Sequence, residues 1–222
     1  MARPWPDRPP SDEERGAYAE AVPRSYWLEG LPEREPHPPL TGSVEADLCI
    51  VGGGFTGLWA ALHAKADDPS RDVLLLESDT IGSGASGRNG GFVSDSLTHG
   101  IANGLARFGD EMELLERLGA ENFEALVADL ERYGIDCGLE RGGDLNVALE
   151  PHEEAWLEDE LALLRRFGHD AVLLDGDAVR AQLASPTYRA GLWDRTRVAL
   201  VDPAALADGL RVAALDARVR VH

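Results

Sequence analysis

The sequence has few cysteines and no long apolar run. Its 222 residues include only two cysteines, Cys49 and Cys137, and these do not form a C-x-x-C pair, so neither a disulfide framework nor a cysteine metal site is expected. No stretch approaches the roughly 20 apolar residues of a membrane-spanning helix. The N-terminus also lacks the apolar core of a signal peptide. These absences predict a cytoplasmic protein with no membrane span and no metal.

Basic residues are also scarce. The sequence contains 21 lysines and arginines against 40 aspartates and glutamates, which gives a formal net charge of −19. Such a charge repels the phosphate backbone of nucleic acids and anionic bilayers, so neither is an expected partner. High solubility is the simplest consequence of the charge. With 44% hydrophobic residues, the chain can still form one substantial core and part of a second lobe.

The order of apolar residues and helix breakers divides the chain into four regions. Residues 1–43, which contain two Pro-Pro pairs, are predicted to form an extended arm that could dock the rings of Tyr26 and Trp27 on the main body. A partly disordered leader fits this composition equally well. The other regions are a strand–helix–strand unit at 44–95, a partial lobe of helices and antiparallel strands at 96–200, and a helix and strand at 201–222 that return to the first unit.

The first unit contains two apolar strands. Residues 47–51 and 73–77 do not alternate polar with apolar side chains, which favours parallel strands buried on both faces, with a helix at 55–66 between them. Asp202 is expected to cap the helix that begins at Pro203. The remaining helices are predicted at 110–133, 151–167 and 176–184, and the remaining strands at 139–149, 171–174, 217–221 and, as a pair, at 189–193 and 198–201.

The motif Gly52-x-Gly54-x-x-Gly57 lies between the first predicted strand and the first helix. There, the first glycine allows a tight turn, the second lets a pyrophosphate approach, and the third lets the helix pack on the strand. The backbone amides near Gly54 and Phe55 point out of the helix N-terminus, where the helix dipole favours an anion. Glu77 ends the second strand and can accept hydrogen bonds from ribose hydroxyls. This combination predicts a dinucleotide site, and the acidic Glu77 disfavours the 2′-phosphate of NADP.

A second glycine-rich segment, at residues 81–92, follows the second strand. Its glycines let the backbone lie against a flat or charged ligand, and Ser86, Arg88 and Asn89 offer hydrogen-bond donors. A plain surface connection is the alternative interpretation. FAD and NAD both present an adenosine diphosphate half to the first motif, and this second segment is the feature that favours FAD.

The runs ADLCIVGGGFTGLWAALHA, VLLLES and IGSGASGRNGGF together resemble the D-amino-acid-oxidase family of FAD enzymes. They are most similar to the branch that holds glycine/D-amino-acid oxidases and γ-glutamylputrescine oxidase, which SYWLEG upstream and RGGDLNVAL downstream also fit. The resemblance implies an α/β fold in which 44–95 form a Rossmann-like FAD-binding unit and 96–200 a partial α+β substrate or cap lobe. It implies that FAD is held by Gly52, Gly54, Phe55, Thr56, Gly57, Glu77, Ser78, Ala85, Ser86, Gly87, Arg88, Asn89, Gly90 and Gly91.

The resemblance also implies an activity. An enzyme of this family oxidises the C–N bond of a small-molecule amine or amino acid, with hydride transfer to the flavin. The catalytic base is not identified, although His99 is a better candidate than His63, which is expected to be structural. Some relatives attach FAD covalently through a histidine where this chain has Arg88, so non-covalent FAD is expected.

Two alternatives to an FAD oxidoreductase stay open. Family members are longer than this chain, so we expect the chain to be truncated, and a second polypeptide could supply the missing half. A non-catalytic nucleotide-binding remnant is therefore one alternative. An NAD-dependent dehydrogenase is the other, although the acidic helical insertion after the second strand argues against it. The sequence does not identify the substrate amine, the electron acceptor or the oligomeric state.

Overall fold

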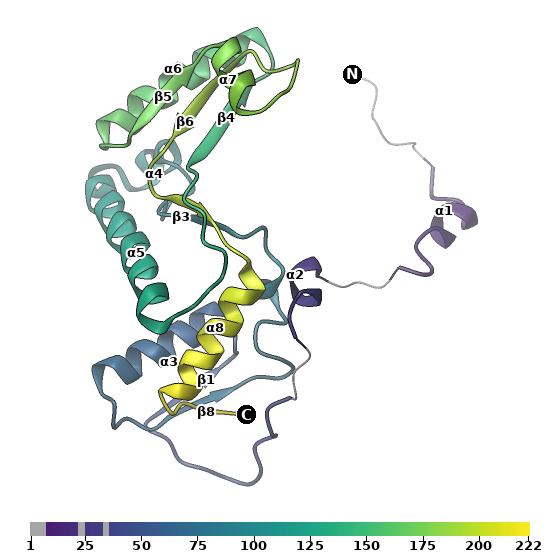
Figure 1. Ribbon diagram of the computed structural model, residues 1–222, viewed down its shortest axis with the longest axis vertical. Helices are drawn as coiled ribbons and strands as arrows, with labels where there is room; N and C mark the ends of the chain where they lie inside the picture. The colour runs from purple at the N-terminus through teal and green to yellow at the C-terminus, as the bar shows by residue number, and fades with distance from the viewer. Residues whose placement is uncertain (1–7, 22–24, 33–35) are drawn as a thin grey trace.

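The computed structural model describes residues 8–21, 25–32 and 36–222. Figure 1 shows an elongated molecule with a parallel sheet at one end and an antiparallel sheet at the other. The predicted arm carries two short helices, α1 (Asp12–Gly16) and α2 (Tyr26–Glu29), so its described part is not extended throughout. Residues 1–7, 22–24 and 33–35 of that predicted arm lie outside the described residues.

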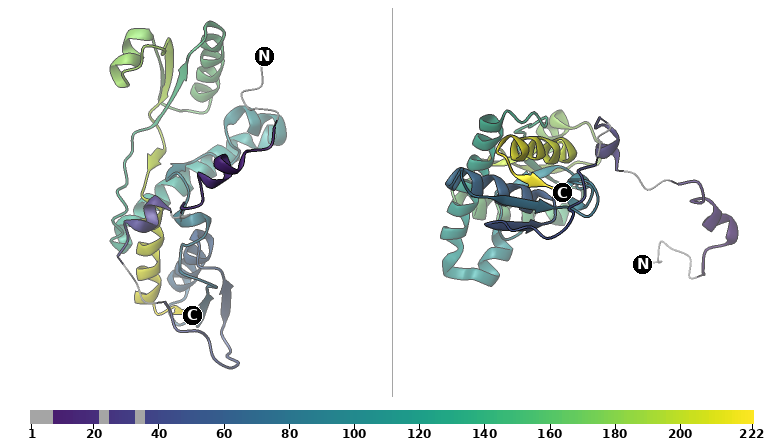
Figure 2. Two further views of the ribbon diagram at one scale, coloured as in Figure 1. Left: turned by 90° about the vertical axis from the view of Figure 1, so that its right-hand side faces the viewer. Right: turned by 90° about the horizontal axis from the view of Figure 1, so that it is seen from below.

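The parallel sheet has the strand order β1-β2-β8. It consists of β1 (Leu48–Val51), β2 (Val73–Leu76) and β8 (Arg220–Val221), and β1 and β8 both run parallel to β2. Helix α3 (Phe55–Asp67) connects β1 to β2, and α8 (Pro203–Asp216) leads into β8. Figure 2 shows these two helices side by side against the sheet. The predicted βαβ unit and the return of 201–222 to its sheet are confirmed. The prediction that both strands are buried is wrong for β1, which lies at the edge of the sheet and alternates between half-buried and exposed residues.

The core of this end is aliphatic. Leu58 and Leu62 of α3, Leu75 of β2 and Leu210 of α8 are all fully buried in one cluster. The predicted cap of α8 is also confirmed, because the Asp202 side chain accepts hydrogen bonds from the amides of the first helical turn. Packing on an apolar helix face therefore positions β1, β2 and the turn between β1 and α3.

The antiparallel sheet has the order β4-β6-β5. Its strands are β4 (Asp144–Ala148), β5 (Ala171–Leu174) and β6 (Ala190–Asp194), and α6 (Pro151–Arg166) and α7 (Gly176–Gln182) pack against it. Leu157 and Leu161 of α6 form a second small core with this sheet. As predicted, Leu145 and its neighbours pair antiparallel and lie outside the parallel sheet.

A two-stranded ribbon and two helices join the two ends. The ribbon pairs β3 (Phe92–Ser94) antiparallel with β7 (Val198–Leu200), and α4 (Ile101–Phe108) and α5 (Met112–Tyr133) follow β3. The two strands predicted at 189–193 and 198–201 are both present, but they lie in different sheets, because β6 pairs in the antiparallel sheet and β7 with β3. No helix in the described part of the chain is long and apolar enough to cross a membrane.

Candidate functional site

The turn from β1 into α3 depends on its glycines. Gly52 has a φ of 103°, a backbone conformation that L side chains rarely adopt, and its amide donates to the Leu76 carbonyl at 2.7 Å. A Cβ atom on Gly57 would lie 2.0 Å from the Gly52 carbonyl oxygen. The first turn of α3 thus packs directly on the backbone of the preceding turn, and no side chain fits between them.

The N-terminus of α3 faces the second glycine-rich segment. Gly54 is the N-cap residue and has no side chain with which to cap the helix. Instead, the Phe55 amide donates to Ser86 Oγ at 2.9 Å. Ser86 lies in the 3₁₀ turn η1 (Ala85–Gly87), 31 residues away. A helix N-terminus that already attracts a hydroxyl oxygen is a favourable place for an anion such as a phosphate.

Glu77 lies directly after β2 and is held by backbone amides. Its Oε2 accepts the Gly53 amide at 2.7 Å, and its Oε1 accepts the Asp79 amide at 3.1 Å. Burial raises the pKa of the Glu77 carboxyl, but these hydrogen bonds, together with one from Ser78, outweigh it and hold the pKa below its ordinary value. Glu77 is therefore an ionised acceptor at neutral pH and is fixed beside the glycine turn.

These elements enclose a pocket of about 500 Å³. The pocket brings together six of the residues that the sequence predicts for the site, namely Gly54, Glu77, Ser78, Ala85, Ser86 and Arg88. Its other lining residues are Asp79, Gly82, Ser83 and Gly84, which the sequence analysis did not assign to the site. The glycine content of residues 82–84 was the signal available for them. Gly53, which donates to Glu77, was missed because the glycine motif leaves its second position open.

The other predicted residues lie around this pocket. Gly52, Phe55, Thr56 and Gly57 form the turn and the first residues of α3, whereas Gly87, Asn89, Gly90 and Gly91 continue from η1 toward β3. The Asn89 side chain shapes this stretch, because it donates to the Ser86 carbonyl at 2.8 Å and accepts the Gly91 amide at 2.8 Å. That these predicted residues contact a cofactor stays a prediction.

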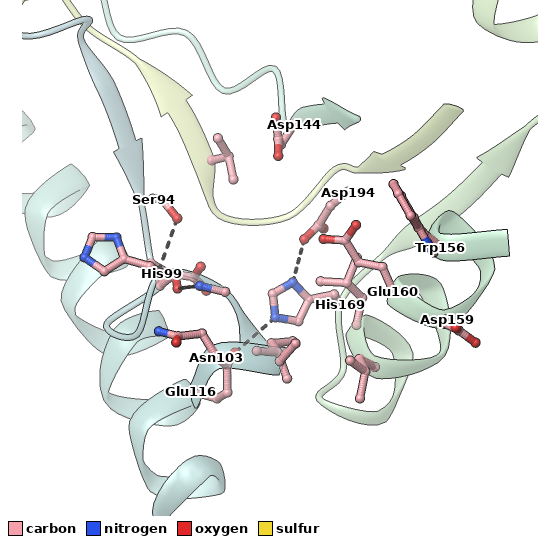
Figure 3. A pocket seen from close by; sticks show the side chains of 18 residues that line it. Ser94, His99, Asn103, Glu116, Asp144, Trp156, Asp159, Glu160, His169 and Asp194 are labelled. Atoms are coloured by element: carbon pink, nitrogen blue, oxygen red, sulfur yellow. Dashed lines mark hydrogen bonds and ion pairs between the residues drawn. The ribbon is translucent and has the colours of Figure 1, made fainter. Parts of the chain in front are cut away.

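A second, larger pocket of about 740 Å³ lies between α4, α6 and the antiparallel sheet (Figure 3). His169 lies in its wall, with Nδ1 2.6 Å from Asp194 Oδ2 and Nε2 3.1 Å from Glu116 Oε2. The hydrogen bond to Asp194 raises the pKa of His169 above its ordinary value, against the opposing effect of burial, and Glu116 adds to the rise. His169 therefore lies nearly buried between two carboxylates, which favour its protonated form.

Arg197 completes this charged cluster. Its guanidinium donates to Asp95, and its Nη2 lies 3.2 Å from His169 Nε2. Asp95, Glu116 and His169 could together ligate a metal ion, but Arg197 already supplies a positive charge to Asp95. Sequence analysis missed the cluster because its members come from four separate segments and no local spacing connects those segments.

The two histidines considered in the sequence occupy different places. His99 follows β3 with a φ of 55° and lines the larger pocket, and Figure 3 shows its imidazole directed away from His169. His63 stacks on Trp59 within α3, with ring centroids 5.7 Å apart. The ring contact of His63 fits the structural role expected for it, and the role of His99 as a base stays a prediction.

Comparisons with known proteins give one consistent family. The sequence profile described as DAO, FAD dependent oxidoreductase, matches residues 47–222. The gamma-glutamylputrescine oxidoreductase of Escherichia coli (strain K12) is 36% identical over 175 residues, which cover 78% of this chain and 40% of that protein. The chain therefore spans about 40% of the length of this curated relative.

Solved structures share the fold at lower identity. The glycine oxidase of Bacillus cereus matches with a TM-score of 0.63 at 22% identity, over 80% of this chain and 46% of that chain. The L-alpha-glycerophosphate oxidase of Mycoplasma pneumoniae, solved with FAD bound, matches with a TM-score of 0.61 at 19% identity, over 80% and 44% of the two chains. At these identities, the likeness establishes the α/β fold.

Proposed function

Because this chain belongs to the family of FAD-dependent oxidoreductases, we propose that the pocket between α3 and η1 holds the adenosine diphosphate half of FAD. The observation that carries the proposal is that three features lie at one pocket: the N-terminus of α3, the all-glycine turn before it and the ionised Glu77. In this arrangement the amides near Gly54 and Phe55 would bind the pyrophosphate. Glu77 would accept the adenosine ribose hydroxyls. The same family membership favours FAD over the NAD alternative.

The residues from Ala85 to Gly91 would hold the rest of the cofactor. Ala85 to Asn89 would lie along the pyrophosphate and the flavin, and Gly90 and Gly91 would lie near the ring, where a side chain would be in the way. A Cβ atom on Gly91 would lie 2.2 Å from the Val201 carbonyl oxygen, so β3 approaches the start of α8 closely at this point. This close packing would keep the segment rigid at the position of the ring.

The activity that we propose is oxidation of the C–N bond of an amine or amino acid. Bound FAD would supply the capacity to take two electrons from that bond. The E. coli relative is named for gamma-glutamylputrescine, which supports an amine as the substrate class. The residues of this chain would bind and orient the cofactor, and His99 is the candidate base. Both cysteines are free thiols, which supports the further proposal of a cytoplasmic location.

Replacing Glu77 with glutamine tests the ribose assignment. The variant keeps the shape of the side chain but loses its charge, and a hydrogen bond to a charged group contributes about 1.5–3 kcal/mol. We expect FAD binding to weaken by roughly 10- to 150-fold. Quenching of FAD fluorescence during titration of the purified chain measures the affinity. Asp67→Asn, which removes an exposed charge at the opposite end of α3, is the matched control. Equal affinities of Glu77→Gln and the wild type would contradict the assignment.

Acid precipitation tests how the cofactor is attached. Arg88 donates through Nε to the Ser83 carbonyl and offers no nucleophile for a covalent bond to the flavin, so we expect acid to release all flavin into the supernatant. Absorbance at visible wavelengths in the supernatant and the pellet gives the two amounts. Flavin that stays on a tryptic peptide containing residues 82–88 would refute non-covalent binding at this segment.

A further inference from the structure

The short helix α2 and the residue before it contact the second glycine-rich segment. Ser25 Oγ donates to the Gly87 carbonyl at 3.0 Å, and Trp27 Nε1 donates to the Asn89 carbonyl at 2.9 Å. Leu28 Cδ2 would lie only 3.0 Å from a Cβ atom on Gly87. Three of four consecutive residues thus contact Gly87 or Asn89, and both hydrogen bonds span 62 positions of the chain.

This stretch has two sides. Toward the pocket, Ser86 places its hydroxyl at the N-terminus of α3. Away from the pocket, Gly87 is buried between Leu28 and the Gly82 carbonyl, and a Cβ atom on Gly87 would lie 2.4 Å from that carbonyl oxygen. Because η1 is only three residues long, a shift of Gly87 on the side facing Leu28 also shifts Ser86 on the side facing the pocket.

The carbonyl groups of the segment are held by side chains. Arg88 donates to Ser83, and Asn89 donates to Ala85 and Ser86. Ser25 and Trp27 extend this set to Gly87 and Asn89 from outside the segment. Carbonyl oxygens carry partial negative charge and repel a phosphate, so hydrogen bonds that fix their directions prepare the segment for an anionic ligand.

We propose that Ser25 and Trp27 are positioning residues for FAD, an inference that rests on the proposed function of the pocket. They hold η1 in the conformation that receives the cofactor and tie it through α2 to α8, against which α2 packs. Without their hydrogen bonds, FAD has to order the segment as it binds, and its affinity falls. The contact also gives the SYW sequence of the arm a role in cofactor binding.

The test is FAD titration of the full chain with Trp27→Phe and Ser25→Ala. Trp27→Phe keeps an aromatic ring and removes the N–H donor, and we expect each variant to bind FAD roughly three- to tenfold more weakly, as the loss of one hydrogen bond predicts. Ser25→Thr keeps the hydroxyl and is expected to retain wild-type affinity. Trp193→Phe is the matched control, because the Trp193 indole donates to the Gly142 carbonyl at 3.1 Å in the antiparallel lobe.

Hydrogen exchange separates positioning from a general structural role. In the apo protein, the amides of residues 82–91 are expected to exchange faster in Trp27→Phe than in the wild type, whereas those of α6 stay unchanged. Equal FAD affinities of Trp27→Phe and the wild type would overturn this inference alone. A loss of affinity that Trp193→Phe reproduces would also overturn it. A wild-type chain that binds no FAD would overturn the proposed function and this inference with it.

Discussion

Replacing Gly57 with alanine is expected to abolish FAD binding at micromolar concentrations of cofactor. The added methyl group would lie 2.0 Å from the Gly52 carbonyl oxygen and 3.2 Å from Ile50 Cγ2. Both obstacles belong to β1 and the turn after it, so α3 has to move away from the sheet. Overpacking of this kind costs about 1–3 kcal/mol of stability. Moving α3 also displaces the amide at Phe55 from its place beside Ser86.

Two measurements distinguish the loss of the site from the loss of the fold. FAD titration gives the affinity, and chemical denaturation gives the free energy of unfolding. Gly142→Ala is the matched control, because a Cβ atom on Gly142 would meet no atom within 4 Å. If Gly57→Ala bound FAD as tightly as Gly142→Ala, the turn would not be the pyrophosphate site.

Replacing Asp194 with alanine is expected to cause a large loss of stability at the other end of the molecule. The substitution removes the partner of His169 Nδ1 and leaves the ring between Glu116 and the Arg197 guanidinium in a nearly buried position. Removing one partner of a buried ion pair costs roughly 3–5 kcal/mol. Urea denaturation at pH 6 measures the effect. Asp170→Ala, which removes an exposed ion pair with Arg195, is the control and should cost less than about 1 kcal/mol.

His169 and Asp194 also make the stability of the protein depend on pH, in opposite directions. Because the folded pKa of His169 is raised, its stabilising effect is complete below the ordinary histidine pKa of about 6.5 and is lost as the pH rises through the folded value. Burial raises the pKa of Asp194, but hydrogen bonds from His169 and Thr196 hold it below its ordinary value, so its contribution is lost as the pH falls through that lowered value. His169→Gln should therefore flatten the fall in stability above pH 6.5, and an unchanged slope would refute the assignment.

The sequence was sufficient to predict the strand–helix–strand unit of β1, α3 and β2 because its signals are local. An apolar strand, a glycine turn, a helix and Glu77 follow one another within 31 residues, from Asp47 to Glu77, and each has a distinct pattern. The antiparallel sheet was harder to assemble. Residues 198–201 form a strand, as their apolar pattern predicts, but nothing in that pattern selects β3 in preference to β6 as its partner.

Besides the two short helices of the arm, strand β3 and helix α4 went unpredicted for physical reasons. Strand β3 has only three residues, Phe92–Ser94, which is too short for an alternating pattern to be recognised. Helix α4 begins after Gly100, which has a φ of 97° and provides no side chain to mark the start. The His169 cluster depends on contacts between distant segments, and only the three-dimensional structure can bring such residues together.

The place of β8 in the sheet has a consequence for how the protein folds. Arg220 pairs with Asp72 across 148 positions in the sequence, and the Glu77 amide donates to the His222 carbonyl at 2.8 Å. The strand β2, which directly precedes Glu77, thus gains its neighbour on one side only after β8 has been made. Contacts of such long range slow folding, because a large loop has to close before the contact is made. The pocket that Glu77 lines should therefore reach its native form only after β8 has paired with β2.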